Sequence, residues 1–228
     1  GIQNRHETVG RLVAEVPTRA RVFERLGIDY CCGGHRPLDE VARERGLDLD
    51  AVVREVDAIE ERPGADRDWL RAGDAELIAH ILDAHHVYLR AELPALQQLV
   101  HKVNRVHREK HPELDELRRV YDALAEELLD HMTKEEQVLF PMFQRLAGGD
   151  ARGAAHCGGV ANPLRVMRTE HEDAGAALAR LRELTASYRV PEGACNSYRA
   201  MLARLEHLER DTHEHIHEEE NILFPRFV

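Results

Sequence analysis

The sequence predicts an all-α protein, with a C-terminal antiparallel four-helix bundle preceded by a small helical domain. Aromatic residues make up only 5% of the 228 residues, whereas Ala, Leu, Glu and Arg, which suit helices, are abundant. No stretch alternates apolar and polar residues with the period of two that a half-buried strand requires. Four long segments instead repeat apolar residues every three or four positions, which is the pattern of amphipathic helices.

The small domain is expected at residues 1–62, where short helical patterns are divided by Pro17 and stopped by Gly27. The charged segment 63–73 begins with a Pro-Gly breaker and is the expected linker. Residues 74–228 hold the four long segments of the bundle, which are joined mostly by short connections and once by the longer stretch 148–161.

Two of the long segments have features that bear on helix geometry. The first contains Pro94, which would kink a helix unless the packing tolerates the lost hydrogen bond. The second is expected to turn one stripe inward, in which Leu128, His131 and Glu135 are followed by Val138.

Composition excludes several classes of partner. The formal net charge is −11, so the phosphate backbone of a nucleic acid is not an expected ligand. No apolar run reaches the ~20 residues of a membrane span, and no signal peptide opens the sequence. The four cysteines, two of them adjacent, do not resemble a disulfide framework. We therefore expect a cytoplasmic protein that binds neither nucleic acid nor a membrane.

One motif occurs twice in the expected bundle. His131-Met-Thr-Lys-Glu135-Glu-Gln-Val-Leu-Phe-Pro141 recurs as His215-Ile-His-Glu-Glu219-Glu-Asn-Ile-Leu-Phe-Pro225. Residues four apart lie on one face of a helix, roughly 6 Å from each other. Each His-x-x-x-Glu pair can therefore aim an imidazole and a carboxylate at one metal ion.

The duplication extends beyond the motif. His86 precedes His131 by 45 residues and His171 precedes His215 by 44, so each half of the bundle reads His…His-x-x-x-Glu. A period this long is far more specific than a single pair. The repeat predicts six metal ligands, namely His86, His131, Glu135, His171, His215 and Glu219.

The alternative is that these residues are ordinary core residues. A histidine in an apolar stripe is more often hydrogen-bonded in the core than bound to a metal. A buried carboxylate without a compensating charge, however, costs several kcal/mol. Glu135 and Glu219 lie on inward stripes without a Lys or Arg on the same stripe within one turn. The agreement of six positions therefore favours a metal site.

Three further residues near the repeat are weaker candidates for a role at the metal site. His85 ranks below its neighbour His86, because only His86 fits the repeat. Glu127, one turn before His131, and Glu170, beside His171, are candidates for orienting the imidazoles or relaying protons. Solvated or capping glutamates explain Glu127 and Glu170 equally well.

The choice of ligands limits the metal. Imidazole and carboxylate suit Fe, Mn or Zn, and the absence of thiolates argues against copper(I), structural zinc or an iron–sulfur cluster in the core. If both glutamates bridge and an oxide adds one ligand to each ion, two six-coordinate irons keep about one vacant position each. Such vacancies suit a diatomic ligand, so oxygen or nitric oxide chemistry is expected. The ferritin-type site uses Glu-x-x-His pairs and more carboxylates.

Four motifs together resemble those of the Repair of Iron Centres (RIC) family, whose members contain a hemerythrin-like di-iron bundle. They are Asp29-Tyr-Cys31-Cys32-Gly-Gly34, the motif 131–141, Glu170-His171-Glu172 and Glu219-Glu-Asn-Ile-Leu-Phe-Pro-Arg226. The resemblance covers nearly the whole chain, and the six expected ligands match the family's ligands position by position. Oxygen-carrying hemerythrins are similar in fold but have a fifth histidine where this chain has Glu219.

The resemblance implies a stress-response protein with two non-haem irons, carboxylate-bridged by Glu135 and Glu219, that repairs iron–sulfur clusters damaged by nitric oxide or peroxide. Repair would proceed by iron donation, by reduction of nitric oxide to nitrous oxide, or both. The implied partners are nitric oxide or oxygen, damaged iron–sulfur proteins and a reductant. An oxygen or nitric oxide sensor or carrier without catalysis is the alternative, and iron storage is a weaker one.

The adjacent cysteines gain a role only from this resemblance. Cys31 and Cys32 would then form a thiol pair that receives iron, nitrosyl or electrons, whereas the alternative is two small residues closing a helix junction. Cys157 and Cys195 have no partner at motif spacing. The chain departs from the family in its longer connection 148–161 and in the extra histidines around His215.

Overall fold

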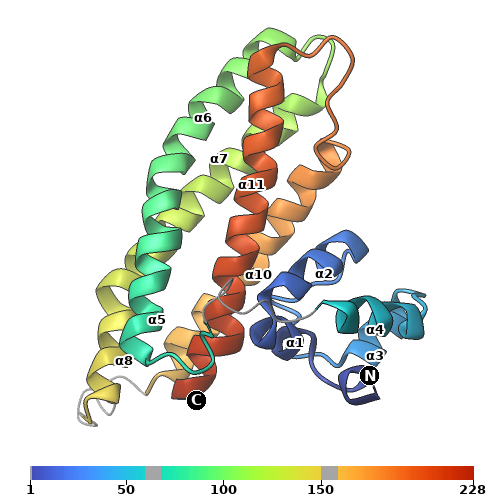
Figure 1. Cartoon of the computed structure of the whole chain (residues 1–228). Coiled ribbons are helices and arrows are strands. Elements are labelled where there is room, and N and C mark those ends of the chain that lie inside the picture. The colour runs from blue at the N-terminus through green and yellow to red at the C-terminus, as the bar shows by residue number, and fades with distance from the viewer. Residues whose placement is uncertain (1, 60–67, 150–158) are drawn as a thin grey trace. The chain divides into compact units, whose positions relative to one another are not determined.

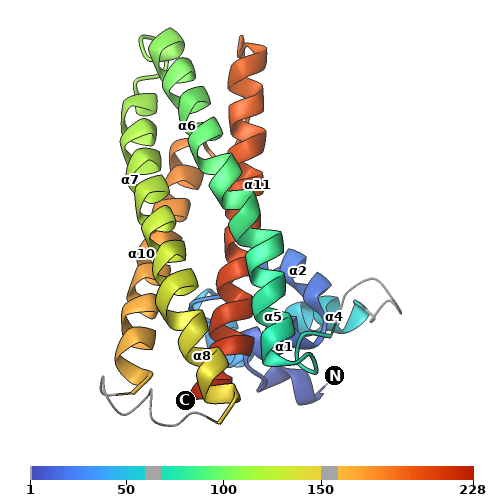
Figure 2. The ribbon, with the colours of Figure 1, turned by 90° about the vertical axis from the view of Figure 1, so that its left-hand side faces the viewer.

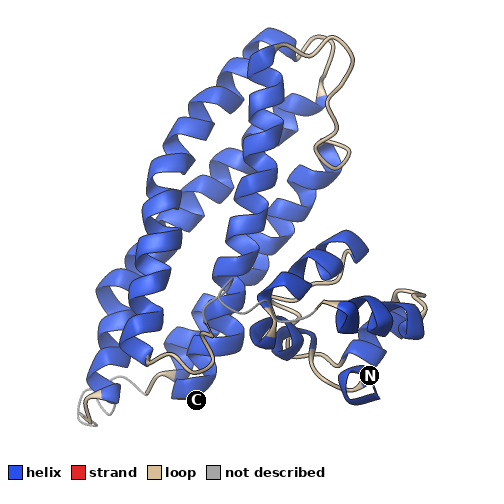
Figure 3. Cartoon of the chain, in the orientation of Figure 1, coloured by secondary structure: helices blue, strands red, loops and turns tan. Residues whose placement is uncertain are grey.

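A computed structural model describes residues 2–59, 68–149 and 159–228 and confirms the all-α class (Figure 3). Within these ranges there is no β-strand, only an isolated bridge between Thr8 and Pro37. None of the helices described is long and apolar enough to cross a membrane. Part of the expected linker 63–73, most of the connection 148–161 and Cys157 lie outside the described residues.

The chain forms two compact units. The first consists of Gly1–Leu77 together with His213–Val228, and the second is Ile78–Thr212. In this division, residues 213–228 group with the N-terminal residues, and the expected domains 1–62 and 74–228 stay a prediction.

The N-terminal part of the first unit is a cluster of short helices around an apolar core. Thr8 caps one helix by accepting the Arg11 N–H, Asp48 caps another, and Gly27 ends a third at φ 67°. The core takes apolar residues from all four α-helices. The elements are η1 (Ile2–Arg5), α1 (Val9–Glu15), η2 (Pro17–Arg19), α2 (Ala20–Leu26), α3 (Leu38–Glu44) and α4 (Leu49–Ala58).

The second unit contains the long helices, which run alongside one another in Figures 1 and 2. The helix entering it continues without a break in the order α5 (Asp74–His80), η3 (Ile81–His86) and α6 (Val87–His107). It is followed by α7 (Glu113–Lys134), η4 (Glu135–Leu139), α8 (Phe140–Ala147), α10 (Ala161–Leu184) and α11 (Asn196–Glu218). The chain ends with η5 (Glu219–Leu223) and η6 (Phe224–Phe227) in the first unit.

The apolar stripes of the long segments are buried as the sequence predicts. Successive helices point in opposite directions (Figure 1), and α7 packs against both α6 and α10. Pro94 lies inside α6 without ending it. Buried stripe residues include Leu89, Leu93, Leu96, Leu117, Leu124, Leu128, Leu164, Leu178, Leu202 and Leu205.

The prediction that Val138 faces inward is wrong. Its side chain is 52% exposed, and the neighbouring Leu139 is buried instead. The reason is the π-helical turn η4, which spans Glu135–Leu139. A π turn holds one residue more than an α turn, so the side chains that follow rotate away from the positions expected at 3.6 residues per turn.

Candidate metal centre

Three of the six expected ligands lie at the ends of π-helical turns. His86 ends η3, Glu135 begins η4 and Glu219 begins η5. In the two copies of the motif, the N–H of the following phenylalanine bonds the carbonyl of the glutamate five residues earlier. Pro141 and Pro225 come next and have no N–H to give, which favours a wider turn. Such turns occur often at functional sites.

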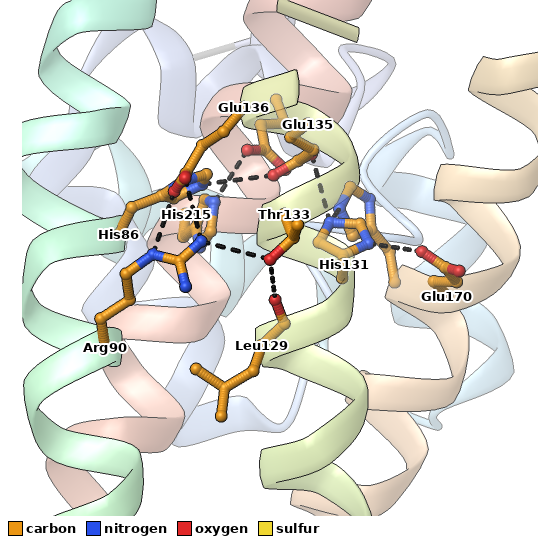
Figure 4. Close-up of polar contacts among 11 residues, drawn as sticks. His86, Arg90, Leu129, His131, Thr133, Glu135, Glu136, Glu170 and His215 are labelled. Atoms are coloured by element: carbon orange, nitrogen blue, oxygen red, sulfur yellow. Dashed lines mark hydrogen bonds and ion pairs between the residues drawn. The ribbon is translucent and has the colours of Figure 1, made fainter. Parts of the chain in front are cut away.

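Glu135 lies between two imidazoles, as Figure 4 shows. One carboxylate oxygen, Oε2, is 3.2 Å from Nε2 of His86. The other, Oε1, is 3.2 Å from Nε2 of His131. The Glu135 side chain is 0% exposed. Each oxygen of this carboxylate could therefore hold a metal ion together with one imidazole.

His171 on α10 adds a third imidazole to this cluster. Its Nε2 lies 3.0 Å from Nε2 of His131, and both rings are buried. Donor atoms of His131, Glu135 and His171 all lie within 4.8 Å of one another. The structure thus brings together four of the expected ligands within the second unit, His86 being the fourth.

The outer nitrogens of two of these imidazoles face carboxylates. His86 Nδ1 is 2.9 Å from Glu136 Oε1, and His131 Nδ1 is 2.7 Å from Glu170 Oε2. Each Nδ1 therefore carries a proton and donates it, so that Nε2 is turned toward Glu135, where it can hold either a proton or a metal ion. Nitrogen and carboxylate oxygen atoms that converge in a buried space need positive charge among them, supplied by protons on the imidazoles or by a metal ion that replaces those protons.

The electrostatics of the cluster also favour positive charge. Burial lowers the pKa of His131, but the carboxylates of Glu135 and Glu170 outweigh burial and raise that pKa to about 9. The hydrogen bond from His131 lowers the pKa of Glu170 to about 2, and Lys134 acts in the same direction. The residues present therefore fit a bound cation, and the nitrogen and oxygen donor set fits iron.

The remaining two expected ligands belong to the first unit. His215 and Glu219 are both buried, and His215 Nε2 lies 2.8 Å from Glu219 Oε1. They repeat the His131–Glu135 pair, in which the nitrogen and oxygen are also in contact. His215 lies on α11, which runs as one helix from residue 196 in the second unit to residue 218 in the first.

The structure supports a contact with an imidazole for only one of the two glutamates, Glu127 and Glu170, that the sequence offers for orienting the histidines. Glu170 contacts His131, whereas Glu127 is on the exposed face of α7 and has no hydrogen bond within the described residues. The residue that sequence reasoning missed is Glu136, which holds His86 and is itself held by Arg90 at 2.9 Å. Burial raises the pKa of Glu136, but the hydrogen bonds from Arg90 and His86 outweigh burial and lower it.

His85 is buried beside His86 but contacts a different carboxylate. Its Nδ1 lies 3.0 Å from Asp211 Oδ1. This contact agrees with the lower rank that the repeat gives to His85.

The cysteine loop belongs to the first unit and contains free thiols. Cys31 is buried, and Cys32 is partly exposed. Asp29 organises the loop, because it accepts the N–H groups of Cys31 and Gly33 and the Cys31 thiol at 3.2 Å. The hydrogen bond with Cys32 and burial raise the pKa of the Cys31 thiol well above its usual range. Elsewhere, Cys195 is exposed and contacts His107.

Comparison with known proteins adds the family. The Hemerythrin HHE cation binding domain matches residues 77–227, and a Domain of Unknown function (DUF542) matches residues 5–60. The iron-sulfur cluster repair protein YtfE of Yersinia pseudotuberculosis serotype IB (strain PB1/+) is 37% identical over 222 residues, which cover 97% of this chain and 96% of that protein. The chain belongs to the Repair of Iron Centres family.

A second relative gives the same result. The iron-sulfur cluster repair protein YtfE of Yersinia pestis (strain Pestoides F) is also 37% identical, over the same shares of both chains. In this RIC protein the two matched domains fall on either side of the expected linker 63–73. Its hemerythrin domain implies iron binding, and the buried histidines and glutamates described above provide suitable ligands.

Proposed function

We propose that this RIC protein is a non-haem di-iron protein that repairs iron–sulfur clusters damaged by nitrosative or oxidative stress. The observation that carries the proposal is the arrangement around Glu135, whose two oxygens face His86 and His131 at 3.2 Å each. The names of its relatives supply the repair function, because both are iron-sulfur cluster repair proteins.

The proposed ligand set has six members from both copies of the motif. His86, His131, Glu135 and His171 form one buried cluster. His215 and Glu219 repeat the His131–Glu135 pair, with their nitrogen and oxygen 2.8 Å apart. We therefore assign them to the same di-iron centre, with Glu135 and Glu219 as bridging carboxylates.

Each group of side chains has a separate task in this proposal. Iron supplies a centre that binds a diatomic ligand, changes oxidation state and can be given up to a client. Glu136 and Glu170 keep the imidazoles of His86 and His131 turned inward. Cys31 and Cys32 are proposed to receive iron or nitrosyl, because their sulfurs and the Asp29 carboxylate lie within 4.8 Å of one another.

Partners and location complete the proposal. The small ligands are nitric oxide or oxygen, the clients are damaged iron–sulfur proteins, and a reductant supplies electrons. The free thiols among the described cysteines support a reducing compartment, so we propose the cytoplasm.

The metal assignment is tested by iron analysis and Mössbauer spectroscopy on protein purified without oxygen. We expect two irons per chain with the spectrum of a coupled pair. Glu135→Ala should lose most of the iron, whereas Gln137→Ala, two residues along the same turn and exposed, should keep it. A single iron in the parent protein would contradict the dinuclear assignment.

Repair is tested by reactivation of an iron–sulfur enzyme that has been damaged with nitric oxide. Reactivation should require iron-loaded protein and should fall in the double variant Cys31→Ala/Cys32→Ala. Equal repair by the double variant would remove the thiol role. Kinetics with nitric oxide distinguish the alternative, because repeated turnover to nitrous oxide indicates an enzyme, whereas a stable nitrosyl adduct alone indicates a sensor or carrier.

A further inference from the structure

Asn221 connects the metal-binding motif to the cysteine loop within the first unit. It lies in the π turn η5, two residues after Glu219. Its side-chain amide donates to the carbonyl oxygen of Tyr30 at 3.1 Å and to that of Cys31 at 3.1 Å. One side chain thus holds the backbone immediately before both thiols.

The surroundings of Asn221 leave little freedom for its amide. A Cβ atom added to Gly10 or to Gly34 would lie 2.5 Å from Asn221 Oδ1, a distance at which atoms collide. The two glycines are joined to each other, since the Gly10 N–H donates to the Gly34 carbonyl at 2.8 Å. The absence of side chains at both positions is therefore what allows the loop to approach the amide.

A neighbouring histidine fixes the amide from a third direction. His217 Nδ1 is 3.0 Å from Asn221 Nδ2, and its buried ring lies edge-on to Tyr30 at 5.5 Å between centroids. The amide nitrogen consequently has three acceptors within 3.1 Å for its two N–H groups, so only one orientation of the carboxamide directs its donors at them.

The duplicated motif provides an internal comparison. The first copy has Gln137 at the position of Asn221, and that side chain is exposed. A copy of the motif can therefore carry its histidine and glutamate without an amide contact of this kind. The second copy has this additional feature, which cannot be explained by metal ligation alone.

Another difference between the copies points to the same N-terminal part of the unit. Met142 of the first copy corresponds to Arg226 of the second, whose guanidinium donates to the carbonyl oxygens of Trp69 and Ala72. Arg226 also pairs with Asp74 at 2.8 Å. The second copy is thus adapted to hold N-terminal segments, and Asn221 is the residue that holds the thiols.

We propose that Asn221 is a positioning residue that fixes the Cys31–Cys32 loop relative to Glu219, so that the thiols keep one place from which to exchange iron or nitrosyl. The proposal rests on the function proposed above for the thiols. Only two residues separate Cys31, whose carbonyl is hydrogen-bonded, from Gly34, which contacts the Asn221 amide, so the Cys-Cys-Gly-Gly segment is held at both ends. Loss of the amide donor would release it.

The test uses the full-length, iron-loaded protein in which Cys157 and Cys195 are replaced by Ser, so that only the loop thiols react. Asn221→Asp keeps the size of the side chain but removes the N–H donor, and Asn221→Ala removes both. Gln137→Ala is the matched control in the first copy. The readouts are the rate of thiol labelling by a chromogenic disulfide, the iron content, and the rate of reactivation of a nitric oxide-damaged iron–sulfur enzyme.

We expect both Asn221 variants to retain their iron. Their loop thiols should be labelled about tenfold faster or more, because the two hydrogen bonds that close the loop are lost. The variants should also reactivate the client more slowly. Gln137→Ala should match the parent in all three readouts. Unchanged labelling would overturn the proposal, as would faster labelling with an unchanged reactivation rate. Failure of the parent protein to repair would instead overturn the proposed function, so the two failures are distinguishable.

If the Asn221 variants do not fold, Gly34→Ala tests the same contact from the other side. Its added methyl group would displace the amide and the Tyr30 carbonyl, both of which lie 2.5 Å from the new atom. Faster labelling and slower reactivation are expected again. Labelling at the parent rate in this variant would overturn the proposal.

Discussion

The proton on Nδ1 of each inner histidine determines what the opposite nitrogen can do. Glu170 accepts this proton from His131, and Glu136 accepts it from His86. Both carboxylates are paired with a cation as well, Lys134 for Glu170 and Arg90 for Glu136. The cations keep the carboxylates ionised, and the ionised carboxylates hold a proton on each Nδ1, so that Nε2 is the nitrogen turned toward the metal.

Glu170→Gln should weaken iron binding. The amide keeps the shape of the side chain but loses the charge that holds the proton on His131 Nδ1, so we expect iron affinity to fall about 10- to 100-fold. Competition with a coloured chelator measures the change. Glu127→Gln is the control, because its side chain is exposed on α7. An equal loss in the control would show that the effect is one of surface charge.

At this scale the sequence was informative where residues repeat and uninformative where contacts cross between helices. The six expected ligands follow from one spacing that occurs twice. Glu127 lies four residues before His131, yet the buried face of α7 is narrow enough to leave it in solvent. Glu136 follows Glu135 directly, and only the packing of α6 against α7 reveals that it reaches His86.

Among the elements, the π turns have the largest effect on the site. Helix periodicity predicted the long helices and their buried stripes, but it assumes 3.6 residues in every turn. The turns at 81–86, 135–139 and 219–223 break this assumption. The turn at 135–139 explains why Val138 is exposed. In the sequence, only the prolines at 141 and 225 indicate the turns at 135–139 and 219–223, and we find no sequence signal for the turn at 81–86.

Pro141→Ala should disturb the metal site through its turn. The new N–H at position 141 can bond the Gln137 carbonyl, which favours an α turn over η4 and moves Glu135, the first residue of that turn. We expect about a tenfold or greater loss of iron affinity, since ligand positions must be held to within ~0.5 Å. Pro94→Ala is the control, because α6 continues through Pro94. An unchanged affinity for Pro141→Ala would remove the role of the π turn.

Tyr121→Phe should destabilise the contact between α6 and α7. The buried hydroxyl donates to the Leu93 carbonyl at 2.8 Å, next to Pro94, and burial raises the pKa of Tyr121 so that it stays protonated. Loss of this bond should lower the free energy of unfolding by about 1 kcal/mol. Tyr88→Phe on α6 should change it by less than about 0.5 kcal/mol. Urea denaturation measures both, and equal effects would contradict the assignment.

For the whole molecule, the pattern of apolar residues predicted the all-α class, but it could not predict the polar contacts that residues 213–228 make with the N-terminal residues. A stripe shows which face of a helix is buried, and it does not show which segment covers that face. The last residues, 213–228, group with the N-terminal residues because of specific contacts such as those of Asn221 and Arg226. In these contacts two polar side chains donate to backbone carbonyls. Because every residue has a backbone carbonyl, the sequence does not indicate which carbonyls will accept.

The proposed ligand set takes residues from both copies of the motif, so iron should stabilise the folded chain. Binding to the folded state alone adds about 4 kcal/mol when free iron is 1,000 times the dissociation constant. For a chain of this size that energy raises the melting temperature by about 10 °C. Calorimetry before and after chelation should therefore show the unfolding transition at a higher temperature with iron than without it. Glu135→Ala should behave like the chelated protein at any iron concentration, because it lacks a bridging ligand. Identical melting curves with and without iron would mean that the six residues do not form one centre.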